Sequence, residues 1–250
     1  MVKLNRVLGG AVLACTLLVG PIVRADEEKP VHLIVKPVVG RVIRTKSVVK
    51  IDLMGMEMEA QGVEKSRVTA VQENGDVITE IVDEGGKIRS AGAEQDLPIT
   101  PTYSITHDKF GKTTKSGKKQ SEDGFTTPEI NKLMDTITDI VLTDKALKPN
   151  DTWQHELENP VIKEKKIVVK DTYLGLDKIA GKGYWKVKQS AEAIVDAAGA
   201  KVTYEVTEWI DPANGETFQF EGSVSNIPTK SGLMTMHVNA KTIEATNKSK

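Results

Sequence analysis

Apolar and polar residues alternate with a period of two over much of this sequence. Between positions 43 and 53 the odd-numbered residues are apolar or small, and most of the even-numbered ones are charged. The same alternation returns in segments 185–195, 202–207, 218–224 and 234–241. Successive residues of a strand point to opposite faces, so this pattern predicts strands with one buried and one solvated face. Such strands are typical of antiparallel sheets, because parallel strands are usually covered on both faces.

Short polar segments with glycine separate the alternating stretches. They are 73–76, 84–87, 108–111 and 211–215. Asn-Gly and Asp-x-x-Gly spacings supply the positive φ angles that tight hairpins need. The sequence therefore predicts a mainly β fold, α+β by count, built as an antiparallel meander of long hairpins.

One segment, 127–142, has the periodicity of a helix. Thr126-Thr127-Pro128-Glu129 combines a hydroxyl cap, a proline in the first turn and a glutamate three residues after Thr126. Apolar residues then recur at helical spacing on one face: Ile130, Leu133, Met134, Ile137, Ile140 and Val141. We expect one mid-chain amphipathic helix whose apolar stripe packs against the concave face of the sheet.

The stretches on either side of this helix are alike. Segment 103–113 and segment 204–217 each begin with tyrosine and continue to an aspartate, a turn and a glycine. This similarity predicts a single β-rich domain over 26–250, made of two duplicated meanders at about 31–125 and 152–248. The alternative is that any two hairpins with Asp-Gly turns look similar.

The first 25 residues have the order of a secretory signal peptide. Lys3 and Arg6 precede an uncharged apolar run over 7–23, and Ala25 precedes three acidic residues. We expect cleavage after Ala25 and export to the periplasm or cell envelope. A membrane anchor and lipidation at Cys15 are the alternatives, although glycines and a proline in the run weaken a spanning helix. Cleavage would remove Cys15, the one cysteine, so the mature chain would contain no disulfide.

Charge and motifs exclude several classes of function. The chain has 34 Lys and Arg against 35 Asp and Glu, which predicts no affinity for nucleic acid. Its aromatic content of 4% argues against a platform that stacks sugars or bases. No histidine has metal-ligand spacing, and no nucleophile elbow, phosphate loop or dinucleotide fingerprint is present. We therefore expect a protein that is not an enzyme and holds no cofactor or metal.

The methionines are unusually placed. Met54, Met56 and Met58 alternate in one segment, and Met234 and Met236 alternate in another. Alternate thioethers on one strand face can pack a core, form an adaptable wall for a greasy ligand, or bind Cu(I). The strand register decides among these alternatives, because a shift by one residue moves a whole strand face from core to solvent.

Three phrases resemble those of a group of exported bacterial proteins of uncharacterised function. They are the K-P-x-D-T-W-type segment Leu147-Lys148-Pro149-Asn150-Asp151-Thr152-Trp153, the hairpin at 173–187 and the turn at 211–217. This group is similar in organisation to the bacterial lipoprotein-carrier (Lol-type) superfamily. The resemblance covers about residues 100–245. It implies a curved antiparallel sheet or unclosed half-barrel that surrounds helices and holds an acyl chain, and it implies no catalytic residues.

These observations predict an exported, non-catalytic protein that binds an apolar ligand, a lipid or acyl chain, in the concavity of its sheet. The alternative is a structural or protein-interaction module of the cell envelope with an envelope protein as partner and no small-molecule ligand. The oligomeric state stays open. The candidate ligand-lining residues are Met54, Met56, Met58, Ile130, Leu133, Met134, Ile137, Trp185, Met234 and Met236.

Overall fold

The computed structural model describes residues 29–118, 126–138 and 141–247. One antiparallel sheet of twelve strands makes up most of these residues, and this confirms the predicted fold class. The strands before the helix are β1 (Arg41–Leu53), β2 (Met56–Val71), β3 (Val77–Ser90), β4 (Ala93–Asp96), β5 (Tyr103–His107) and β6 (Thr113–Ser116). The strands after it are β7 (Thr152–Glu158), β8 (Lys166–Ile179), β9 (Lys182–Ile194), β10 (Lys201–Ile210), β11 (Thr217–Thr229) and β12 (Gly232–Asn247).

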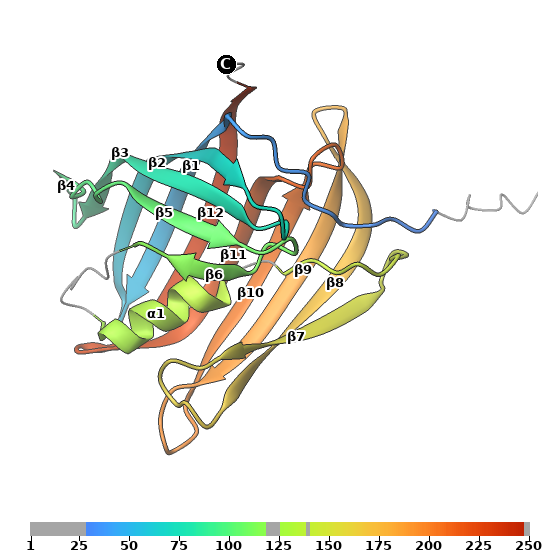
Figure 1. Cartoon of the computed structure of the whole chain (residues 1–250). Helices are drawn as coiled ribbons and strands as arrows, with labels where there is room; N and C mark the ends of the chain where they lie inside the picture. The colour runs from blue at the N-terminus through green and yellow to red at the C-terminus, as the bar shows by residue number, and fades with distance from the viewer. Residues whose placement is uncertain (1–28, 119–125, 139–140, 248–250) are drawn as a thin grey trace, which may run out of the picture.

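The first and last strands meet in the middle of this sheet. The spatial order is β6-β5-β3-β2-β1-β12-β11-β10-β9-β8-β7, with β4 paired beside β3. Strands β6 and β7 form the two edges and do not pair with each other in the described part of the chain. The sheet curves around the helix α1, which lies on its concave side (Figure 1). The result is an unclosed half-barrel.

Helix α1 (Pro128–Ile137) begins where the sequence predicts and ends earlier. The hydroxyl of Thr127 accepts a hydrogen bond from the backbone N–H of Ile130 at 3.3 Å, which caps the helix. The prediction that the helix reaches residue 142 is wrong. The N–H of Leu142 donates to the carbonyl of Phe110 at 2.8 Å, so the chain has left the helix by this point.

Two hydrophobic clusters fill the half of the concave side nearest β7. In the larger one, three buried residues of α1 pack onto strands β7 to β11. The smaller one joins the extended segment 29–39 and the loop 141–150 to strands β8, β9 and β10. Its buried residues are Leu33, Leu142, Leu147, Trp153, Tyr173, Val187 and Ile210.

The turn expected at 84–87 is instead a bulge inside β3. Gly85 has φ +94°, and the register of β2 against β3 shifts between Gly62 and Glu64. A Cβ on Gly86 would lie 2.2 Å from the carbonyl oxygen of Gln61, so a side chain has no room there. A glycine pair in a strand can therefore mark a bulge as well as a turn.

Two sequence predictions stay predictions. The structure shows two runs of strands in chain order on either side of the β1–β12 pair, and it does not test whether they arose by duplication. The signal peptide at 1–25 and Cys15 lie outside the described residues.

Replacing Leu133 by alanine should destabilise the protein, because this side chain is fully buried between α1 and the sheet. We expect the free energy of unfolding in urea to fall by about 2–5 kcal/mol. Lys132→Ala, at an exposed position of the same helix, should change it by less than about 0.5 kcal/mol. Equal effects of the two variants would show that α1 does not pack as described.

Candidate ligand groove

The register places four of the five clustered methionines on the concave face. Two cross-strand rows run over β2, β1 and β12: Met56, Leu53 and Met234 in one, and Met58, Ile51 and Met236 in the other. Met234 and Met236 pair in turn with Ile227 and Val224, which are buried in the same cluster as α1. Directly opposed residues share a face of the sheet, so both rows face the inside of the half-barrel.

Two more rows continue this surface along the same three strands. They consist of Ala60, Val49 and Val238, followed by Gly62, Ser47 and Ala240. We call the four rows together the inner surface. From Leu53 to Ser47 it spans seven residues of β1, or about 20 Å at the rise of an antiparallel strand. Most of its side chains are half-buried, because the buried residues of α1 pack over the other half of the sheet.

A cavity of about 260 Å³ lies at the end of the inner surface that is farther from the β1–β2 turn. Its lining includes Val49 and Ala60 of the inner surface, together with Tyr103 and Lys118. Here the side chains become polar, so the surface changes from apolar to polar along its length.

Two carboxylates face each other at this polar end. Glu64 pairs with Asp83 across β2 and β3. Burial raises the pKa of Glu64, with a further increase from the charge of Asp83 and an opposing effect from Lys118. Asp83 accepts backbone hydrogen bonds from Gly85 at 2.8 Å and Thr100 at 2.9 Å. Lys118 forms an ion pair with Asp135 of α1 at 2.8 Å, which connects the helix to this end of the inner surface.

The candidate lining residues from the sequence do not form one site, although Met234 and Met236 pack against the same larger cluster as α1. Met56, Met58, Met234 and Met236 belong to the inner surface, with Met56 at its outer end and 52% exposed. Met54 is in the β1–β2 turn and 73% exposed, outside the rows. The residues of α1 belong to the larger cluster, where Ile130, Leu133 and Ile137 are buried and Met134 is partly buried. Trp185 packs on the smaller cluster.

Sequence reasoning missed a buried polar cluster on the same face, which we define as His155, Asp171, Gln189 and Glu208. Asp171 is fully buried, and its Oδ2 lies 3.2 Å from Nδ1 of His155. Gln189 stands opposite Asp171 on the neighbouring strand. Thr217 donates a hydrogen bond to Glu208 at 3.1 Å. The cluster contributes ionisable groups to an otherwise apolar interior.

Burial changes the acidity of this cluster. Loss of water raises the pKa of Glu208 to about 8, an effect that its hydrogen bond from Thr217 opposes. Burial also raises the pKa of Asp171, and contacts with His155 and Gln189 oppose that increase. The signal was present in the sequence, because all four residues occupy the inward phase of their strands' alternation. The sequence signal for this cluster is a polar residue at a strand position where the alternation predicts an apolar one.

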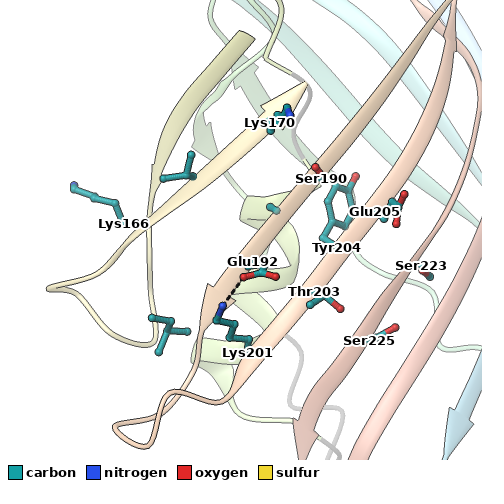
Figure 2. Close-up of a pocket in the computed structure, with 13 residues that line it drawn as sticks. Lys166, Lys170, Ser190, Glu192, Lys201, Thr203, Tyr204, Glu205, Ser223 and Ser225 are labelled. Carbon is teal, nitrogen blue, oxygen red and sulfur yellow. Dashed lines mark hydrogen bonds and ion pairs between the residues drawn. The ribbon is translucent and has the colours of Figure 1, made fainter. Parts of the chain in front are cut away.

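A depression of about 730 Å³ lies on the opposite face of the sheet and spans β8 to β11. Figure 2 shows its polar lining, with α1 behind the strands. Lys201 pairs with Glu192 at 2.6 Å, and Lys166 pairs with Glu158. This depression belongs to the solvated outer face and does not suit an apolar ligand.

The described residues contain neither a group of metal ligands nor a membrane-spanning helix. Over residues 29–118, 126–138 and 141–247, no three His, Cys, Asp or Glu side chains are grouped so that they could hold a metal ion. Within the same ranges no helix has both the length and the hydropathy to cross a membrane.

No protein-family model and no curated protein sequence matches this chain. Among solved structures, a candidate lipoprotein from Parabacteroides distasonis aligns with 85% of this chain and 97% of its own, at 14% identity and a TM-score of 0.41. A candidate exported protein with a YmcC-like fold from Bacteroides fragilis aligns with 86% and 100%, at 13% identity and 0.39. The hypothetical lipoprotein YmcC from Escherichia coli aligns with 80% and 83%, at 12% identity and 0.30. At these scores no family is identified, and the resemblance to lipoprotein carriers stays a prediction.

Glu208 should make stability depend on pH. Its pKa is about 8 in the folded protein and near 4.5 when unfolded, so the unfolded chain loses this proton first as pH rises. The free energy of unfolding should therefore fall between about pH 4.5 and 8. In Glu208→Gln this part of the slope should disappear, which would stabilise the variant relative to wild type by a few kcal/mol at pH 8.

Chemical unfolding at a series of pH values measures this difference. Glu205→Gln provides the control, since Glu205 lies on the outer face of the same strand in an ion pair with Lys188. An identical pH profile for Glu208→Gln and wild type would contradict the burial of this carboxyl group.

Proposed function

We propose that this chain is an exported, non-catalytic protein that binds an elongated apolar ligand, a lipid or acyl chain, along the inner surface. The observation that carries the proposal is the inner surface itself. Four consecutive rows of mainly apolar side chains face the inside of the half-barrel, and most remain half-buried beside α1.

Covering such a surface with an apolar ligand lowers the free energy, because apolar area is removed from water. Burying apolar area contributes about 25 cal/mol per Å², and a contiguous apolar patch on a soluble protein commonly marks a binding site. The length of about 20 Å suits an extended hydrocarbon chain. Flexible methionine side chains adapt to ligands of different shape. The polar end at Glu64 and Asp83 would accommodate a headgroup in contact with water.

Export is part of the proposal and rests on the sequence of residues 1–25. Together with a groove for an apolar chain, it supports a role in holding lipid material in the cell envelope.

A structural or protein-interaction module is the second candidate. The outer edges of β6 and β7 favour it, because they pair with no further strand among the described residues and such an edge can add a strand from another chain. This function predicts a stoichiometric protein partner and an empty inner surface.

Substitution of Val49 by aspartate tests the groove. Val49 faces inward and Val48 faces outward on the same strand, and both are half-buried. In native mass spectrometry of protein purified from its own host, wild type and Val48→Asp should carry a releasable lipid. Val49→Asp should lose about tenfold or more of it, because a charge in the groove must be desolvated.

Circular dichroism should show both variants folded, and Met58→Asp serves as a second inward variant should Val49→Asp fail to fold. Wild-type protein without bound lipid, or equal lipid on all variants, would refute the proposed groove. A protein partner found instead would favour the interaction module.

The intact mass tests the leader. Cleavage after Ala25 should leave residues 26–250, without Cys15. A chain that begins at Cys15 with added acyl mass would show lipidation instead, and a chain that retains residues 1–25 would show an anchor.

A further inference from the structure

The tips of two neighbouring hairpins carry exposed apolar side chains. Met54 is 73% exposed, Leu233 58% and Met56 52%, all next to the β1–β2 or β11–β12 turn. Leu53 pairs with Met234, so both turns lie at the same end of the sheet. A Cβ on Gly232 would lie 2.3 Å from Sδ of Met54, which shows that the turns touch. We call Met54, Met56 and Leu233 the hairpin-tip patch.

This patch wraps around the end of the sheet. Leu233 is next to the inward-facing Met234 and so points to the outer face, whereas Met56 points to the inner face and Met54 occupies the turn between them. The row of Met56, Leu53 and Met234 is also the first row of the inner surface. The apolar end of the inner surface therefore coincides with the exposed apolar side chains of the hairpin tips.

The size of the patch distinguishes between possible partners. A stable protein interface buries about 800 Å² on each side, and three side chains at two hairpin tips supply much less. Binding to a lipid surface requires no minimum contact area of this kind, because each apolar side chain that enters the interfacial region adds its own burial energy.

The surrounding charges distinguish between lipid surfaces. Asp52 and Glu57 flank the first turn, and Lys230 lies in the second. The carboxylate of Asp52 accepts a hydrogen bond from the N–H of Gly55 at 2.8 Å, which fixes the turn. Because two acidic groups stand against one basic group, the tips have no basic cluster of the kind that attracts anionic lipid. They suit a zwitterionic surface.

We propose that the hairpin-tip patch docks on a zwitterionic phospholipid bilayer, with the apolar end of the inner surface turned toward the lipid. The contact itself is independent of any ligand in the groove, while its use in loading or releasing a lipid rests on the proposed function.

Co-sedimentation with phosphatidylcholine vesicles tests this contact. The protein is prepared from the full chain in a Cys15→Ser background, so that no acyl anchor contributes. Wild type should bind the vesicles, and the double variant Met54→Asp with Leu233→Asp should bind about tenfold or more weakly. Aspartate is tolerated at the positive φ of residue 54, +54°, so this turn should keep its shape. Ile99→Asp, at a position 67% exposed near the polar end of the groove, is the matched control and should bind like wild type.

Three results would overturn the inference. The first is equal vesicle binding by the double variant and wild type, and the second is no binding by wild type. The third is light scattering that shows a dimer which the double variant dissociates, since the patch would then contact a second copy of the chain. Val49→Asp separates this inference from the proposed function, because it should lose the bound lipid and keep vesicle binding.

Discussion

The pairing of β1 with β12 is the constraint on which this structure depends. It joins thirteen residues of the first strand to the last strand of the same chain, from Arg41 opposite Asn247 to Leu53 opposite Met234. Each half of the sheet would otherwise end in a long unpaired edge. The same pairing brings the two methionine segments into adjacent rows, although almost 180 residues separate them in the sequence. The inner surface is therefore a product of topology as much as of composition.

The two halves of the concave side differ in how they are covered. Toward β7, α1 and the segment 29–39 bury the strands in two hydrophobic clusters. Toward β3, the inner surface is left half-buried and ends in a polar cavity. Between the two clusters lie Asp171 and Glu208, whose burial costs stability at the pH where they ionise. A core built for stability alone would place apolar residues there.

Much of the fold could be predicted from the sequence because alternation and capping act locally. Alternation predicted β1 and the strands from β9 to β12, and the capping residues predicted the start of α1. The unclosed form of the sheet was implied by the resemblance and not by these local patterns. The end of α1 could not be predicted, since it depends on a hydrogen bond from Leu142 to Phe110. The bulge at Gly85 and Gly86 could not be predicted either, because it depends on how closely the backbone of Gln61 on β2 approaches Gly86. For the site, the residue types were informative, but only the register showed which methionines face inward and that Met54 does not.

The central position of the β1–β12 pair also has a consequence for how the chain folds. Its contacts span nearly the whole sequence, so a large loop-closure entropy must be overcome before they form, and folding with such distant contacts is slow. The two halves can form hairpins locally, but neither can complete its row of backbone hydrogen bonds alone. The middle of the sheet is thus the last part of the protein that can assemble, and it cannot do so before the ribosome has synthesised β12.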